Sequence, residues 1–198
     1  DLCMKALGVD KGYIGIEDNK PEAVKVLTEA FASVPEVTVE VLPTKYPQGA
    51  EKMLIKAVTD REVEPGGLPM DVGCVVSNVG TVIAITDAVC HGIPFIERVT
   101  TVTGDCIKEP KNLSLRIGTP FQYAIDYCGG FSSQPDRVIA GGPMMGLAQF
   151  QLDVPVAKGV SGILALSPEK CQVGVEDPCI RCGRCVDACP MGLIPSQL

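Results

Sequence analysis

Four cysteines near the C-terminal end of the sequence constrain the structure more than any other feature. They lie in the stretch Cys179-Ile180-Arg181-Cys182-Gly183-Arg184-Cys185-Val186-Asp187-Ala188-Cys189-Pro190, with two, two and three residues between them and a proline after the last. This is the spacing with which thiolates bind a [4Fe–4S] cluster. Three thiolates from one tight loop reach three corners of one cluster, and where a protein holds two clusters the fourth cysteine binds the other one.

Zinc and disulfide bonds are the alternative uses of such cysteines. Zinc sites usually pair two knuckles a dozen or more residues apart, whereas this chain has no second pair and a single histidine, His91. A disulfide framework is typical of short secreted chains, and we expect no secretory signal here. We therefore predict that the ligands of an iron–sulfur cluster are Cys179, Cys182, Cys185 and Cys189.

The composition is that of a globular protein. The chain has 198 residues, of which 46% are hydrophobic and 21% charged, and it is long enough to bury a core in one or two domains. Its formal net charge of −7 argues against binding of nucleic acid. The longest uncharged runs, at residues 72–86 and 138–152, are shorter than the roughly 18–20 apolar residues of a transmembrane helix, so we predict none.

Strand and helix patterns alternate through the first half of the chain. We expect them, in turn, at residues 12–17, 21–34, 37–41, 48–58, 71–77 and 81–90. The strand at 71–77 is apolar enough to be covered on both faces, and the helix at 81–90 is apolar almost all round and is expected to be buried. This alternation predicts a parallel α/β sheet.

The pattern changes in the second half. We expect strands at residues 94–103, 113–117, 137–140 and 159–166, and a short helix at 121–128 that ends at a glycine pair. This order predicts a small α+β domain. The glycine-rich stretch 141–146 lacks the Lys-Ser/Thr of a phosphate-binding loop, so we predict a tight turn there.

Polar residues follow two of the expected strands. Glu17-Asp18-Asn19 follows the first strand, and Asn78-Val79-Gly80-Thr81 follows the third. Parallel α/β sheets bind ligands at the carboxyl ends of their strands, where a carboxylate can accept hydrogen bonds from ribose hydroxyls and a helix N-terminus can bind phosphate. A solvated turn and simple helix capping are the respective alternatives, and both stay open.

Several stretches match motifs of one known family. They are Tyr46-Pro47-Gln48-Gly49-Ala50-Glu51-Lys52, Pro65-Gly66-Gly67-Leu68-Pro69, Asn78-Val79-Gly80-Thr81, Glu97-Arg98-Val99, Val102-Thr103-Gly104, Arg116-Ile117-Gly118-Thr119-Pro120, Gly141-Gly142-Pro143-Met144-Met145-Gly146 and the cysteine run. With these motifs the chain resembles, over most of its length, the C subunit of the Rnf electron transport complex, the membrane ferredoxin:NAD+ oxidoreductase. That subunit is similar in turn to the flavin-binding 51-kDa-type subunit of respiratory complex I.

The resemblance implies three domains. A partial, parallel Rossmann-like sheet would form an FMN- and NADH-binding α/β domain over residues 1–97. A soluble-ligand-binding, β-grasp-like α+β domain would follow over residues 98–157. Residues 158–198 would contain a connecting strand and a C-terminal ferredoxin-type cysteine segment.

The resemblance also implies cofactor sites, without any catalytic side chain. It places Glu17, Asp18 and Asn19 at an NAD(H) site. It places Asn78 and Thr81 at a second site, near the FMN. The complex I motif at the second site is Asn-Asn-Val-Glu-Thr, and this chain has Ser77 and Gly80 in place of two of its members. We expect a flavin-binding glycine loop and a second four-cysteine run outside this stretch, hence two 4Fe-4S clusters in the full-length protein and an incomplete cluster site here.

The implied function is electron transfer. NADH gives two electrons and a cluster takes one, so FMN would connect NAD(H) to the [4Fe–4S] clusters. We expect an NADH-linked oxidoreductase subunit, inactive as this stretch alone, on the cytoplasmic face of the membrane. Its partners would be other subunits of the complex and, indirectly, ferredoxin. A flavin and iron–sulfur cobalamin reductase of the propanediol-utilisation type is one alternative, and a docking module without nucleotide chemistry is another.

Overall fold

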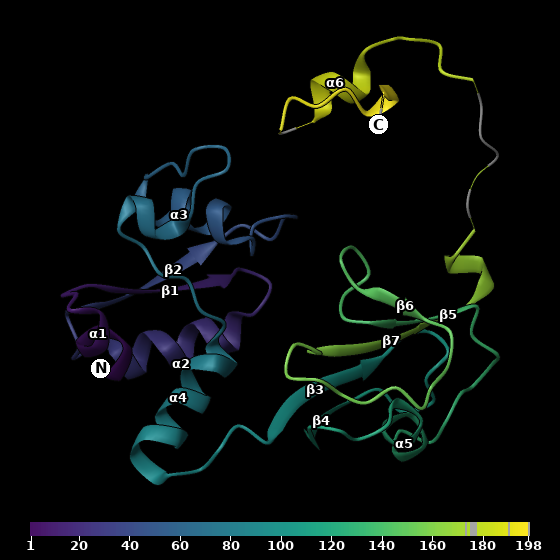
Figure 1. The fold of residues 1–198 in the computed structure, drawn as a ribbon, viewed down its shortest axis with the longest axis horizontal. Coiled ribbons are helices and arrows are strands. Elements are labelled where there is room, and N and C mark those ends of the chain that lie inside the picture. Colours follow the sequence, from purple (N-terminus) through teal and green to yellow (C-terminus); the bar gives the residue numbers. More distant parts are fainter. Residues whose placement is uncertain (173, 175–177, 190, 198) are drawn as a thin grey trace. The chain divides into compact units, whose positions relative to one another are not determined.

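The computed structural model describes residues 1–172, 174, 178–189 and 191–197. The chain divides into two units, Asp1–Ile96 and Glu97–Leu198 (Figure 1). A parallel sheet lies in the first unit and a mixed sheet in the second, which confirms the predicted α/β class followed by an α+β sheet. The finer division into three domains stays a prediction.

The first unit is built on a parallel strand pair. Its elements in chain order are α1 (Leu2–Leu7), β1 (Gly12–Glu17), α2 (Pro21–Phe31), β2 (Val37–Leu42), α3 (Glu51–Thr59), the 3-10 helix η1 (Pro69–Val72) and α4 (Val79–His91). β1 and β2 pair from Gly12↔Val37 to Glu17↔Leu42. Pro21 opens α2, because proline needs no hydrogen-bonded N–H in the first turn and its φ already suits a helix.

Two glycines in β1 let helices approach the strands from both faces. A Cβ atom at Gly12 would lie 3.1 Å from Met4 Sδ of α1, and one at Gly15 would lie 2.7 Å from Leu54 Cδ1 of α3. Side chains three positions apart on a strand point to opposite faces. α1 and α3 therefore cover opposite faces of the β1–β2 pair, and Figure 1 shows α2 on the same side as α1.

The predicted strand at residues 71–77 is wrong. Residues 69–72 form η1, which ends at Gly73 with a φ of 67°, and residues 74–78 have no regular secondary structure. An apolar run forms a strand only where a neighbour supplies hydrogen bonds to its backbone, and no described strand pairs with this segment. The parallel sheet therefore has two strands, and Val75 is 62% exposed.

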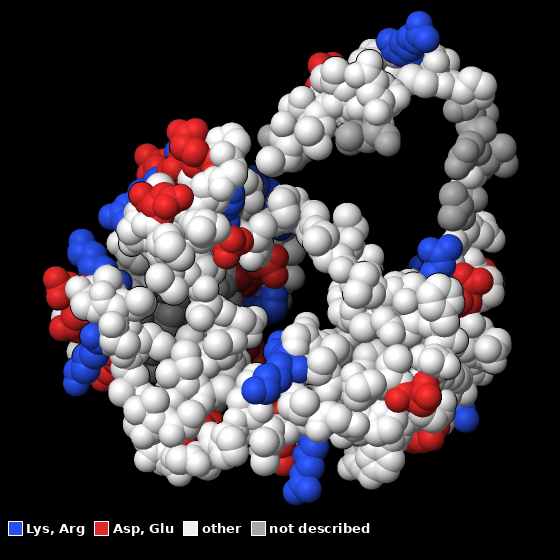
Figure 2. Space-filling model, viewed as in Figure 1, with Lys and Arg blue, Asp and Glu red and all other residues white. Residues whose placement is uncertain are grey.

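Helix α4 forms where the sequence predicts it, but the prediction that it is buried is wrong. No described residue of α4 is buried, and Val79, Ile83 and Val89 are each more than 60% exposed. An apolar helix is buried only where another element offers a surface to pack against. The two-stranded sheet of this unit has little area left to cover α4. In Figure 2, charged side chains of both signs are interspersed over the first unit, whereas α4 is largely uncharged on the visible face.

The second unit is a five-stranded sheet with one helix packed on it. The sheet and its packed helix consist of β3 (Glu97–Thr103), β4 (Lys111–Arg116), α5 (Phe121–Tyr127), β5 (Arg137–Ala140), β6 (Leu147–Gln149) and β7 (Gly162–Leu166), with the strand order β4-β3-β7-β5-β6. β7 lies in the middle, parallel to β3 and antiparallel to β5. The strand that the sequence predicts as a connection is thus the centre of this sheet, and β6 was not predicted.

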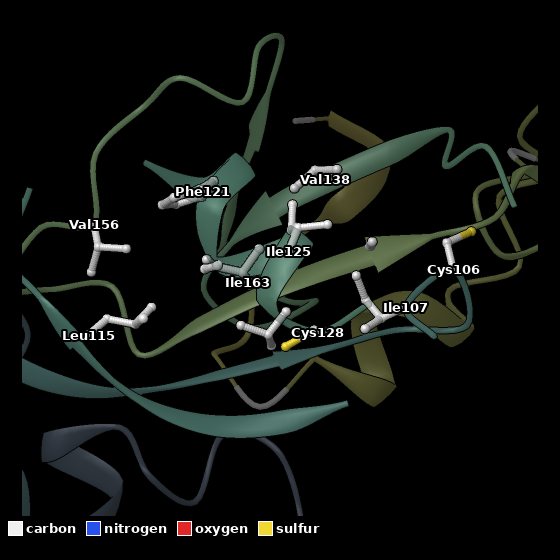
Figure 3. Packing of buried hydrophobic residues seen from close by; sticks show 12 residues of the cluster. Cys106, Ile107, Leu115, Phe121, Ile125, Cys128, Val138, Val156 and Ile163 are labelled. Carbon is white, nitrogen blue, oxygen red and sulfur yellow. The ribbon is translucent and has the colours of Figure 1, made fainter. Parts of the chain in front are cut away.

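The hydrophobic core of the second unit lies between α5 and the sheet (Figure 3). Phe121 and Ile125 of α5 are at most 1% exposed, as are Val102 of β3 and Ile163 of β7. The helix residues recur at i and i+4, which places them on one face. The short helix predicted at residues 121–128 is thus confirmed, and this face of it is buried against the sheet.

Candidate cofactor sites

The carboxyl end of β1 carries the three residues predicted for the nucleotide site. Lys20 Nζ donates hydrogen bonds to Glu17 Oε2 and Asn19 Oδ1, both at 2.8 Å. The Glu17–Lys20 ion pair is on the surface, so its contribution to stability is only about 0–1 kcal/mol. The structure thus brings Glu17 and Asn19 together around one ammonium group.

Asp18 contacts a different partner, Thr44, which follows β2. Asp18 Oδ1 accepts hydrogen bonds from Thr44 N at 3.1 Å and Thr44 Oγ1 at 2.6 Å. These bonds, the one from the hydroxyl above all, lower the pKa of Asp18 below its ordinary value of 3.8 because they favour the ionised carboxylate. β1 and β2 are parallel, so their carboxyl ends share one edge, and Thr44 lies at the predicted site.

Sequence reasoning missed Thr44 and Lys20. Thr44 comes two residues after β2, which the sequence predicts correctly as a strand parallel to the first. The same rule that selected the residues after β1 therefore selects Thr44 as well. Lys20 stands directly before the predicted helix and next to the acidic residues, so its charge was the available signal.

Asn78 and Thr81 lie at the start of α4. Asn78 is the N-cap residue: its Oδ1 accepts a hydrogen bond from Gly80 N at 3.0 Å, and its carbonyl oxygen accepts one from Thr81 N at 2.9 Å. These contacts are ordinary helix capping. Among the described residues no hydrogen bond joins Asn78 or Thr81 to the residues at the end of β1. Because α4 has 13 residues, its N-terminus still carries a dipole that favours an anion.

The four cysteines lie before, within and after α6 (Arg184–Ala188), which follows the 3-10 helix η2 (Pro168–Lys170) and precedes η3 (Pro195–Gln197). Three of the thiols are exposed and that of Cys189 is half-buried. Among the described residues, which include these four, no three metal-binding side chains are gathered closely enough to hold a metal ion. The donor set nevertheless fits a [4Fe–4S] cluster, since four accessible thiols occupy one short segment at the required spacing.

Two left-handed residues shape this cysteine loop. Arg181 has a φ of 58° and Gly183 a φ of 77°. The left-handed conformation is unfavourable by roughly 1–2 kcal/mol for a residue with a side chain, so Arg181 is held in it by the loop. The Arg181 N–H donates to Cys179 Sγ over 3.4 Å, and hydrogen bonds to cluster sulfurs help to set the reduction potential of a cluster.

A small cavity of about 220 Å³ opens in the second unit. It lies beside Thr101 and Thr103 of β3, the start of β7 and residues 141–143. Residues 141–146 connect β5 to β6 as a turn, which confirms that prediction. None of the residues predicted for the cofactor sites is among those that line the cavity.

None of the helices described in the structure has the length and apolar character needed to cross a bilayer.

Three family profiles match the chain. The Nuo51 FMN-binding domain matches residues 1–87, the SLBB domain residues 99–148, and a 4Fe-4S binding domain residues 175–194. The C subunit of the proton-translocating ferredoxin:NAD(+) oxidoreductase complex of Clostridium ljungdahlii is 60% identical over 197 residues, which cover 100% of this chain and 43% of that protein. The chain is homologous to this C subunit.

Two further relatives support the same assignment. The C subunit of the Na(+)-translocating ferredoxin:NAD(+) oxidoreductase complex of Acetobacterium woodii is 53% identical, over 100% of this chain and 44% of the relative. The C subunit of the ion-translocating oxidoreductase complex of Rhodobacter capsulatus is 45% identical, over 100% of this chain and 38% of the relative. The chain therefore spans less than half the length of these subunits, and the family resemblance predicted from the motifs is confirmed.

Proposed function

We propose that the protein containing this chain is an electron-transfer subunit of a membrane-associated ferredoxin:NAD+ oxidoreductase. It passes electrons between NAD(H), FMN and [4Fe–4S] clusters. The observation that carries this proposal is the cysteine run: it lies within the matched 4Fe-4S domain, on the same chain as a matched FMN-binding domain. A flavin is the group that exchanges two electrons with NADH and single electrons with clusters.

The residues at the end of β1 bind NAD(H) in this proposal. The Glu17 carboxylate is partly exposed beside Lys20 and can accept hydrogen bonds from the ribose hydroxyls. Asn19 and Asp18 lie at the same edge and belong to this site, Asn19 through its contact with Lys20 and Asp18 through its contact with Thr44. Asn78 and Thr81 belong to the FMN site, where the N-terminus of α4 favours the phosphate group.

The cysteine loop holds the clusters. Cys179, Cys182 and Cys185 bind one [4Fe–4S] cluster, and Cys189 binds a second cluster completed by residues outside this chain. The relatives are subunits of ion-translocating complexes. We therefore place the protein as a peripheral subunit on the cytoplasmic face of the membrane, in contact with other subunits and linked through them to ferredoxin.

The test is the cofactor content of the full-length protein, purified without oxygen. We expect iron and acid-labile sulfide for two [4Fe–4S] clusters, one FMN, and bleaching of both chromophores by NADH. Cys182→Ser should lower the iron and sulfide content while the flavin stays bound, and Cys90→Ser, which replaces an exposed cysteine of α4, should change neither. Protein that carries no flavin, or that reduces cob(III)alamin but shows no ferredoxin-linked NAD+ reduction, would overturn the proposal.

A further inference from the structure

The polar contacts at the carboxyl edge of β1 and β2 divide the predicted nucleotide residues into two groups. Glu17 and Asn19 contact Lys20, a neighbour in sequence. Asp18 instead reaches 26 residues along the chain to Thr44. It is thus the residue of this group whose side chain joins two different strand ends.

The Asp18–Thr44 contact is reinforced by the backbone. Asp18 N–H donates to the carbonyl oxygen of Leu42 at 2.9 Å, one step beyond the last register pair, Glu17↔Leu42. The side-chain carboxylate then accepts both the N–H and the hydroxyl of Thr44. Two hydrogen bonds to Thr44, next to the one to Leu42 of β2, thus hold the start of the β2–α3 loop, residues 43–50, against the end of β1.

The rest of this loop has few other fixed points. Gln48 N–H donates to the Lys45 carbonyl oxygen at 2.8 Å, which closes a turn, and Gln48 is buried. Lys45, Tyr46 and Pro47 lie between the fixed Thr44 and the buried Gln48, and Tyr46 is 61% exposed. A cation and an aromatic ring at the carboxyl edge of a parallel sheet suit the phosphates and a ring of a dinucleotide.

We propose that Asp18 is a positioning residue: its carboxylate fixes Thr44 and thereby presents Lys45 and Tyr46 to the dinucleotide, rather than binding the ligand itself. The identity of the ligand rests on the proposed NAD(H) site, whereas the contact between Asp18 and Thr44 does not depend on that site. The lowered pKa of Asp18 keeps the carboxylate ionised, and able to accept both bonds, throughout the physiological pH range.

The test uses four variants of the full-length protein: Asp18→Ala, Asp18→Asn, Thr44→Val and Asp18→Ala/Thr44→Val. Asp10→Ala removes a carboxylate before the amino end of β1 and is the matched control. Amide hydrogen exchange of the peptide covering residues 43–48 is measured without nucleotide. We expect it to be about fivefold faster in Asp18→Ala, as for loss of one ordinary hydrogen bond at an exposed position, less affected in Thr44→Val, and unchanged in Asp10→Ala.

The kinetics with NADH separate positioning from direct contact. We expect KM to rise about three- to tenfold in Asp18→Ala with kcat nearly unchanged. The double variant should resemble Asp18→Ala, because residues that act through one contact are not additive. Asp18→Asn keeps an acceptor oxygen and should restore most of both the protection and KM.

The outcomes distinguish this inference from the proposed function. A large rise in KM in Asp18→Ala and Asp18→Asn, with residues 43–48 still protected, would show direct contact and overturn the positioning role. Unchanged exchange in Asp18→Ala would overturn it as well. If the wild-type protein failed to bind NADH while Asp18→Ala still released the loop, the NAD(H) site would be wrong and the Asp18–Thr44 link would stand.

Discussion

Gly104, which follows β3, passes so close to β7 that it leaves no room for a side chain. A Cβ atom here would lie 1.9 Å from the carbonyl oxygen of Ala165 and 2.7 Å from that residue's N and C atoms. The backbone φ of 124° is also one that L residues rarely adopt. Gly104→Ala should therefore push β3 and β7 apart where Cys106 N–H donates to the same Ala165 oxygen.

We expect Gly104→Ala to lower the free energy of unfolding of the second unit by about 4 kcal/mol. Backbone strain at a φ of this kind contributes about 1–3 kcal/mol, and overpacking against backbone atoms contributes about 1–3 kcal/mol more. Ala165 and its neighbour Ile163 are fully buried, so the strand cannot move without opening the core. Because domains are stable by only about 5–15 kcal/mol, this loss leaves the unit marginal.

Two other glycines separate the steric overlap from the backbone strain. Gly118 has a φ of 97° with nothing within 4 Å of an added Cβ, and Gly159 has neither a positive φ nor a close neighbour. In urea unfolding followed by circular dichroism, Gly118→Ala should lose about 1–2 kcal/mol and Gly159→Ala should change by less than about 1 kcal/mol. Hydrogen exchange of peptides from the second unit shows whether the loss of stability lies in that unit. A Gly104→Ala protein no less stable than Gly118→Ala would refute the close approach of Gly104 to Ala165.

Three further predictions concern the core, a helix cap and an acidic side chain. Ile163→Ala, in the central strand β7, should lose about 2–5 kcal/mol in urea unfolding, because the residue is fully buried. Asn78→Ala should lose about 1 kcal/mol of helix stability, measured by exchange of α4 amides, and Asn78→Ser should restore it; if Asn78 also binds FMN, Asn78→Ser will still weaken flavin retention. Asp105 accepts hydrogen bonds from Ser167 Oγ and N at 2.5 and 3.0 Å, which lower its pKa. Its folded pKa is below the unfolded value, so the stabilisation is present above about pH 4 and is lost as the pH falls through the folded pKa. Ser167→Ala should therefore flatten the acid limb of a stability–pH profile.

The spacing and type of apolar residues correctly predicted those helices and strands that pack one face against the rest of the protein. The helix at Phe121 was predicted, and its apolar residues at helical spacing, Phe121 and Ile125, are buried in the core. The strand Val37–Leu42 is rich in β-branched residues and pairs with its predicted neighbour. In both cases the signal is contained in the element itself.

Partners distant in sequence were beyond the reach of these patterns. Residues 71–77 are apolar enough for a buried strand, yet no described strand offers them hydrogen bonds. α4 is apolar enough for burial, yet Ile83 is 61% exposed. β7 looked like a connection, although it supplies hydrogen bonds to strands on both sides. The apolar character of a segment shows that it can be buried. Whether it pairs as a strand depends on which other segments lie beside it in the fold.

The cofactor sites follow the same division. The cysteine run could be recognised because the four proposed ligands lie in one short segment, where spacing alone limits which atoms can meet. The site at the end of β1 is different: Asp18 and Thr44 are 26 residues apart and meet only because β1 and β2 are parallel neighbours. A list of polar residues after strands therefore names the edge of a sheet but not the role of each side chain. That role depends on contacts between strand ends. The contacts of Asp18 with Thr44 are the reason we propose that this predicted ligand positions Lys45 and Tyr46 instead.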